Sequence, residues 1–383
     1  MEVLFIKLLN MSITAGWIVL GVFLLRLALK KAPRWAVCAL WALVGVRLVC
    51  PVSFESVLSL IPSAETISPN ILYSSAPQIQ SGIDFINSAV NPALSESFAP
   101  DVYASANPMQ IAAFIASAVW LFGAAAMLLY AAFSYIRLRR RVAAAVLFSD
   151  NLWQSEAVSS PFVLGFFRPR VYLPFGLDEG AMACIASHEW AHIKRRDHLI
   201  KPAAYLLLCV YWFNPLIWLA YILLCRDIEL ACDERVIKDM GADGKKAYSR
   251  ALLSFGAARN AVLACPLAFG EVGVKLRVKN VLNYRKPAFW IIIAALILCA
   301  AASIMFLSNP KTLNHLDDGL NASVSSAILS ENSGGNDKDF QAQAHVVLDT
   351  RQSGLNRVTV YALKLYQEYT QAEPGGYELV YGS

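Results

Sequence analysis

Residues 199–225 read LIKPAAYLLLCVYWFNPLIWLAYILLC, and they decide how the rest of the chain is arranged. The stretch is apolar and long enough to cross a membrane, which takes about 20 residues of helix. Its interior, however, contains Asn214 followed by Pro215. Proline lacks a backbone N–H and disfavours helix at the residue before it. The stretch therefore has two readings, a single span or two antiparallel helices that turn at Asn214–Pro215.

Composition places the chain in a membrane. Of its 383 residues, 57% are hydrophobic and 16% are charged, with a mean hydropathy of +0.48. Soluble domains carry about 25% charged residues. The sequence predicts an α-helical polytopic membrane protein, embedded in the lipid bilayer by four spanning helices. These helices are expected at residues 4–29, 33–52, 109–136 and 287–307.

The loops predict the orientation of these helices. Lys and Arg gather between the first two runs, after the third and before the fourth, whereas residues 53–108 contain neither. Because cytoplasmic loops are enriched in Lys and Arg, we expect 53–108, both termini and the tail 308–383 to lie outside the cell. Residues 137–286 then lie in the cytosol. Topology accounts for the basic residues, so no direct binding of nucleic acid is expected.

The cytosolic segment has the length of one compact domain. Its β-branched and aromatic residues, broken by Gly and Pro, predict a small sheet with strands near 153–158, 162–166 and 170–173. A helical pattern with acidic residues at its start follows. In the tail, the alternation over 357–369 predicts one more strand. None of the eight cysteines lies in the predicted outer parts, so no disulfide framework is expected.

The helical pattern contains a His-Glu-x-x-His motif. His188 and His192 are four residues apart, so on a helix they project from one face and can bind one Zn²⁺. Glu189 is placed to take a proton from a water on that metal. Three of the five histidines of the chain fall within eleven residues here, which favours a zinc site over a charged surface helix.

Two residues compete for the role of third ligand. His198 has the offset of the His-Glu-x-x-His-x-x-Gly-x-x-His arrangement, but Arg195 stands where that arrangement needs a glycine. If the helix simply continued through Arg195, His198 would point away from the metal. Glu229 has Asp233 four residues later, which is the gluzincin spacing of a ligand followed by a carboxylate that orients a ligand histidine.

The long apolar stretch decides between them. A single span over 199–225 would put Glu229 about 30 Å from His188, across the bilayer. It would also invert the last span against its basic flank. A hydrophobic hairpin over 199–229 brings the chain back to its starting side. We therefore predict the hairpin and a zinc site made by His188, His192 and Glu229.

Several stretches resemble the BlaR/MecR family of membrane zinc metallopeptidases, the antibiotic-sensor signal transducers. The two main ones are ASHEWAHIKRRDHL at 186–199 and FNPLIWLAYILLCRDIELACDERVI at 213–237. The others are VRLVCPVSFESVLSL at 46–60, SPFVLGFFRPRVYLP at 160–174 and PLAFGEVGVKLRVKNVL at 266–282. The resemblance covers about residues 1–307 in order.

The resemblance implies a cytosolic gluzincin-like zinc peptidase. In it His188, His192 and Glu229 would bind Zn²⁺, Glu189 would be the general base and Asp233 would hold a ligand histidine. The strand at 170–173 would be an edge that pairs with an extended peptide substrate.

The resemblance also implies a signalling role. An extracellular ligand would trigger self-cleavage near PLAFGE, with Phe269 at its centre, and a cytosolic repressor-type protein would then be inactivated. The sequence leaves open whether the protein forms a homodimer. The tail 308–383 is too short for the penicillin-binding sensor domain of the antibiotic sensors. We expect a different, partial sensor module there, and an outside ligand other than a β-lactam.

Three other functions fit the pattern less well. A non-catalytic receptor with a structural zinc site has no use for Glu189. A transporter needs ionisable residues inside its spans, and the predicted spans carry them only toward their ends. The CAAX-type and quality-control membrane proteases share the His-Glu-x-x-His…Glu-x-x-x-Asp layout but not the loop matches.

Overall fold

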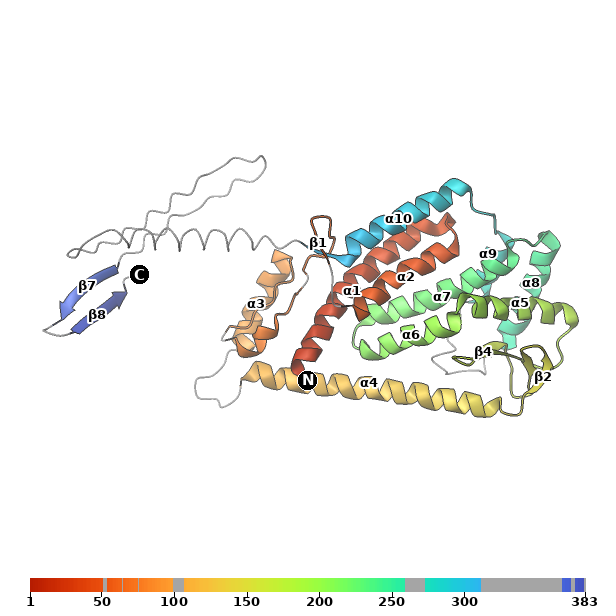
Figure 1. Ribbon diagram of the computed structural model, residues 1–383, viewed down its shortest axis with the longest axis horizontal. Helices are drawn as coiled ribbons and strands as arrows, with labels where there is room; N and C mark the ends of the chain where they lie inside the picture. The colour runs from red at the N-terminus through yellow and green to blue at the C-terminus, as the bar shows by residue number, and fades with distance from the viewer. Residues whose placement is uncertain are drawn as a thin grey trace. The chain divides into compact units, whose positions relative to one another are not determined.

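The computed structural model describes residues 1–50, 54–63, 65–74, 76–98, 107–258, 273–310, 367–372 and 376–381. The chain divides into two units, residues 1–311 and 312–383, and each is described by itself. The first unit is mostly helical (Figure 1). Its α-helices are α1 Glu2–Ala28, α2 Arg34–Val49, α3 Asp84–Phe98, α4 Pro108–Arg141, α5 Glu179–Arg195, α6 Asp197–Val210, α7 Pro215–Ile237, α8 Ala242–Ala258, α9 Val274–Leu282 and α10 Phe289–Leu307.

Three helices of the described part are long and apolar enough to cross a membrane, by length and composition. They are Glu2–Lys31, Pro108–Arg141 and Phe289–Leu307, and they correspond to the first, third and fourth predicted runs. The second predicted run corresponds to α2, which has 16 residues. A helix of that length reaches about 24 Å, less than the hydrocarbon core of about 30 Å. A fourth span at α2 therefore stays a prediction.

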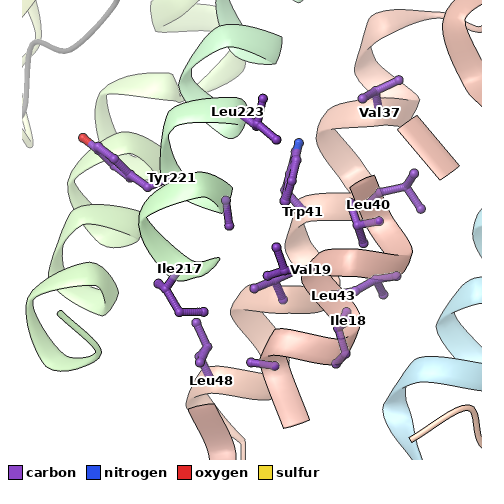
Figure 2. Close-up of a cluster of buried hydrophobic side chains, with 14 of the residues drawn as sticks. Ile18, Val19, Val37, Leu40, Trp41, Leu43, Leu48, Ile217, Tyr221 and Leu223 are labelled. Atoms are coloured by element: carbon purple, nitrogen blue, oxygen red, sulfur yellow. The ribbon is translucent and has the colours of Figure 1, made fainter. Parts of the chain in front are cut away.

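Helices α1, α2 and α7 pack side by side and form the main hydrophobic core (Figure 2). In the close-up, Val19 of α1 and Trp41 of α2 lie on the side that faces α7, with Ile217 opposite them. α10 packs against α2 on another side. Close approach needs a small residue at Gly21 of α1, where an added Cβ would lie within 2.2 Å of the Phe306 ring.

The stretch 199–225 forms two helices, and the second begins at Pro215. Asn214 caps it, because its side-chain oxygen accepts from the Leu216 N–H at 2.9 Å. The same side chain donates to the Ser12 hydroxyl of α1 at 2.7 Å. α6 and α7 pack against each other as an antiparallel hairpin (Figure 1). The turn lies at the position predicted from Asn214 and Pro215.

A four-stranded sheet precedes α5, in the order β2-β3-β5-β4. β5 pairs with β3 in parallel and with β4 in antiparallel fashion. The prediction that 170–173 is an edge strand is therefore wrong, because β5 has a neighbour on each side. The edges are β2 and β4. The strands are β2 Val146–Ser149, β3 Leu152–Gln154, β4 Phe162–Leu164 and β5 Arg170–Leu173.

The predicted outer loop 53–108 contains secondary structure that the sequence did not predict. It holds a strand, β1 Phe54–Ser56, a 3₁₀ helix, η2 Pro69–Tyr73, and α3. β1 pairs in parallel with β6 Ser308–Pro310, the strand that directly follows α10. The two segments predicted to lie outside the cell therefore contact each other.

The second unit contains one described element, an antiparallel hairpin of β7 Gln367–Ala372 and β8 Gly376–Tyr381. The strand predicted over 357–369 lies outside the described residues except for its last three positions, which belong to β7.

Candidate metal centre

Helix α5 carries the His-Glu-x-x-His motif on its buried face. The helix begins at a capped end, where the Asp178 carboxylate accepts from the Ala181 N–H at 3.0 Å. His188, Glu189 and His192 lie one turn apart or adjacent, and each is no more than 7% exposed. α5 packs against α7, α8 and the sheet, so this face points into the protein and away from solvent.

Glu229 of α7 meets the two histidines of α5. The Nε2 atoms of His188 and His192 lie 3.2 Å apart. Glu229 lies 3.5 Å from each of them, through Oε2 to His188 and through Oε1 to His192. All three residues are buried, and they form a group able to hold a metal ion.

The spacing of this group fits zinc. Zn²⁺ binds His N and carboxylate O at about 2.0–2.2 Å, and a tetrahedral arrangement then separates the ligand atoms by about 3.3 Å. The three observed separations are 3.2 Å and twice 3.5 Å. The two 3.5 Å separations reach different oxygens of the Glu229 carboxylate, so the group offers two imidazole nitrogens and one carboxylate around a possible metal position.

The opposite ring nitrogens are held by hydrogen bonds that turn the Nε2 atoms toward the metal position. His188 Nδ1 lies 2.8 Å from the Tyr248 hydroxyl and 3.2 Å from Asp233 Oδ1. His192 Nδ1 lies 2.9 Å from Asp197 Oδ2. A proton on each Nδ1, shared with these acceptors, would leave each Nε2 electron pair for a metal, which is the tautomer that metal binding requires.

Two buried carboxylates of the site, those of Glu229 and Asp233, have lowered pKa values. Burial alone would raise the pKa of Glu229, but Lys201, 2.9 Å from Oε1, and His192 hold that pKa well below its usual value. Burial likewise opposes the charge on Asp233, yet Arg277 holds the pKa of Asp233 below its usual range. Both groups are therefore charged at neutral pH, the form in which carboxylates bind metal.

Cys232 lies beside this group and contacts the residues that surround His192. Its Sγ is 3.2 Å from His192 Nδ1 and 3.1 Å from Asp197 Oδ2. Burial raises the pKa of Cys232 to about 11. The group is a thiol at neutral pH, and it donates to Asp197. His192, Asp197 and Cys232 make a second buried group close enough to hold a metal ion, and in this structure they form a hydrogen-bonded support of His192.

A cavity of about 590 Å³ opens next to the metal group. Glu189, His188, His192 and Glu229 line one side of it. Most of the remaining wall is apolar and comes from the long helix α4, the edge strand β4, and α6. Among these wall residues are Leu128, Ala131, Tyr135, Phe162, Leu164 and Leu206.

The structure brings most of the predicted site residues together, but not all of them. The structure brings His188, His192 and Glu229 together, with Glu189 and Asp233 beside them. His198 lines the cavity, but it is not part of the metal group of the described residues.

α5 does not continue straight through Arg195. It ends there, and Arg196 takes a left-handed conformation with φ 62°. Phe269 lies outside the described residues.

Sequence reasoning missed four residues of the site, namely Asp197, Lys201, Tyr248 and Arg277. Asp197 lies only five residues after His192, so the sequence offered a signal for it. Tyr248 and Arg277 are 60 and 89 residues from His188, on separate helices, and only Arg277 falls in a stretch that resembles the family.

Comparison with known proteins identifies the family. Residues 6–281 match the family model described as BlaR1 peptidase M56, which is more than half of the chain. The protein belongs to the BlaR1 peptidase M56 family. The resemblance to BlaR/MecR proteins stated from the sequence is thereby confirmed.

Two relatives illustrate the match. The chain is 27% identical to the regulatory protein BlaR1 of Bacillus licheniformis over 219 residues, which is 50% of this chain and 36% of that protein. It is 24% identical to the methicillin resistance MecR1 protein of Staphylococcus aureus over 138 residues, which is 34% of this chain and 24% of MecR1. The alignment thus spans well under half the length of either relative.

As a member of the M56 peptidase family with three described helices apolar enough to cross a membrane, the protein is membrane-associated. The family implies a metal. In the described part of the chain, the group of His188, His192 and Glu229 offers a place for it.

Proposed function

We propose that this protein is a membrane-anchored zinc metalloendopeptidase of the gluzincin type that transmits an extracellular signal by proteolysis in the cytosol. The observation that carries the proposal is the convergence of His188, His192 and Glu229 beside Glu189, at the wall of a cavity. Structural zinc sites are closed by four protein ligands, whereas catalytic sites keep one position open. Three ligands next to a cavity favour catalysis over a structural site.

Each residue has a role in peptide hydrolysis. A zinc ion at this group would polarise the substrate carbonyl and lower the pKa of water. The Glu189 carboxylate takes a proton from the attacking water as its oxygen bonds to the carbonyl carbon. It then delivers that proton to the amide nitrogen as the C–N bond breaks. Asp233 and Asp197 hold the imidazoles of His188 and His192 in place.

The edge strand β4 is the better candidate for peptide binding. It forms part of the cavity wall, and one of its sides has no strand partner in the four-stranded sheet. An extended peptide adds to such an edge through main-chain hydrogen bonds, while its side chains enter neighbouring pockets. The apolar wall supports a substrate with a bulky apolar residue next to the cleaved bond.

The membrane arrangement follows the loops. We propose four spans, α1, α2, α4 and α10, with 53–108 and both termini outside and 137–286 in the cytosol. The basic end of α4, Arg139–Arg141, supports this orientation because such clusters stay on the cytoplasmic side.

The substrates we propose are the chain itself, near Phe269, and a cytosolic repressor-type protein, in keeping with relatives named as regulatory and resistance proteins. The outer tail would receive the ligand.

Substitution of the general base tests the enzyme assignment. In Glu189→Gln, the zinc content of the full chain in membranes should stay at the wild-type value, because the ligands are untouched. Cleavage, followed as zinc-dependent self-cleavage or peptide hydrolysis, should fall at least about 10²-fold.

Glu179→Gln is the matched control, since Glu179 is an exposed residue in the first turn of the same helix. It should behave like the wild type. Cleavage that persists in Glu189→Gln would end the assignment.

A further inference from the structure

Arg277 is a buried cation that reaches the metal group from outside the motif. It lies on α9, the short helix between α8 and α10, and it is 3% exposed. α9 packs against both α7 and α8. Burying a charge is unfavourable unless it is fully paired, so its partners indicate why it is there.

The partners of Arg277 are metal-site residues. Its Nε donates to Asp233 Oδ2 at 2.8 Å, and its Nη2 donates to Asp233 Oδ1 at 2.6 Å. Nη1 lies 3.4 Å from Glu229 Oε2, and Nη2 lies 3.2 Å from His188 Nε2. The pair with Asp233 is a two-point fork, which fixes direction as well as charge.

Asp233 is the residue through which this fork reaches the metal ligand. Asp233 Oδ1 lies 3.2 Å from His188 Nδ1 and accepts from the Tyr248 hydroxyl at 2.7 Å. Three hydrogen-bond donors therefore share one carboxylate. Packing fixes two of these donors. Tyr248 itself belongs to the small core between α8 and α9, and Arg277 lies on α9, which Val281 anchors in the same core.

We propose that Arg277 is a positioning residue of the metal site, which holds the Asp233 carboxylate in the orientation that directs His188 Nε2 to the metal. The proposal rests on the metal site of the proposed function. When a metal binds His188 Nε2, that nitrogen is no longer available to Arg277. Asp233 then remains as the two-point partner of Arg277. Outer partners of metal ligands typically change metal affinity by about 10- to 100-fold.

The metal-binding test uses the full chain in detergent or lipid nanodiscs. Zinc affinity is measured by competition with a chromophoric chelator, and ligand geometry by the visible absorption of the Co²⁺-substituted protein. Arg277→Gln should weaken zinc binding about 10- to 100-fold and alter the Co²⁺ spectrum. Lys275→Gln, at an exposed position of the same helix, should change neither.

Two further variants separate positioning from charge and from folding. Arg277→Lys keeps the charge but loses the fork, so it should restore zinc affinity only in part. The double variant Arg277→Gln, Asp233→Asn removes the buried pair together and leaves no unpaired charge. It should bind zinc about as weakly as Asp233→Asn alone, because both changes act on one interaction.

Three results would overturn the proposal: wild-type zinc affinity in Arg277→Gln, full restoration in Arg277→Lys, or additive losses in the double variant. A wild-type chain that binds zinc but shows no Glu189-dependent cleavage would instead overturn the proposed function and leave the role of Arg277 intact.

Discussion

His192 is oriented by a carboxylate that its own stretch of chain supplies. Arg196, with φ 62°, interrupts the helix between α5 and α6, and Asp197 then begins α6 with Oδ2 2.9 Å from His192 Nδ1. A left-handed conformation at a residue with a side chain is unfavourable by about 1 kcal/mol. The chain keeps this conformation where it turns Asp197 back toward His192, which links the local strain to the site.

Replacing this carboxylate should weaken metal binding. We expect Asp197→Asn to lower zinc affinity about 10- to 100-fold, because the amide no longer enforces a proton on His192 Nδ1. Chelator competition on the full chain measures the change. His198→Ala is the neighbouring control, and it should keep wild-type affinity, since His198 lies outside the metal group of the described residues. A loss in His198→Ala equal to that in Asp197→Asn would return His198 to the candidates for third ligand.

The parts of the site that sequence could predict are those fixed by local geometry. His188, Glu189 and His192 follow from helical spacing, and Glu229 follows once Pro215 is read as a turn. Tyr248 reaches the site only because α8 packs on α5, and no local pattern encodes that packing.

At the scale of elements, α7 carries acidic residues on two opposite sides. Asp227 and Glu229 are two residues apart, which places them about 200° apart around a helix. Glu229 faces α5, whereas Asp227 faces α1 and α2. There it accepts from Arg26 at 2.7 and 2.8 Å and from the Trp41 indole at 2.9 Å. The buried ion pair thus fixes the rotation of the helix that carries Glu229.

Breaking this pair should destabilise the protein strongly. The Asp227 side chain is fully buried and that of Arg26 is 13% exposed. Removing one partner of a buried pair costs about 3–5 kcal/mol. We expect Asp227→Asn to lower the free energy of unfolding in detergent by about that amount. Asp239→Asn, in a pair with Lys286 that is 70% exposed on both sides, should change it by less than about 1 kcal/mol. Equal stability of the two variants would contradict the rotational role.

At this scale, the order of the strands in the small sheet could not be predicted from the sequence. Strands were predicted near the positions of β3, β4 and β5, but β2 was not, and β5 was assigned the wrong place in the order. Composition and turns mark where a short strand lies. Its neighbours depend on how β3 and β5 come together in parallel around the intervening β4. That is a long-range choice with no local signal.

At the scale of the whole first unit, hydrogen bonds show where the tip of the α6–α7 hairpin contacts α4 and α2. The hairpin tip contacts α4 at Trp120, whose indole donates to the Val210 carbonyl at 2.7 Å, while the Trp212 indole donates to the Trp120 carbonyl at 3.1 Å. The tip also meets the far end of α2, where the Tyr211 hydroxyl donates to the Leu48 carbonyl at 2.8 Å. The cavity lies farther along α4, beside Leu128 to Leu138.

In the proposed membrane arrangement, this registry puts the metal group near one face of the bilayer. The 34 residues of α4 span about 51 Å, well beyond the hydrocarbon core of about 30 Å. The cavity lies toward the end of α4 that carries Arg139–Arg141.

Whether α2 crosses the membrane can be decided by labelling three added cysteines with a membrane-impermeant maleimide. Lys31, Ser88 and Lys246 are exposed and lie before α2, in α3 and in α8. With four spans, Ser88→Cys should be labelled in intact cells, while Lys31→Cys and Lys246→Cys should react only after permeabilisation. The wild-type chain gives the background of its native cysteines. If α2 stayed on one side, Lys31→Cys and Ser88→Cys would react from the same side, because no span would separate them. The Lys31–Ser88 pair therefore tests α2 itself, whereas Ser88 and Lys246 are separated by α4 in either arrangement.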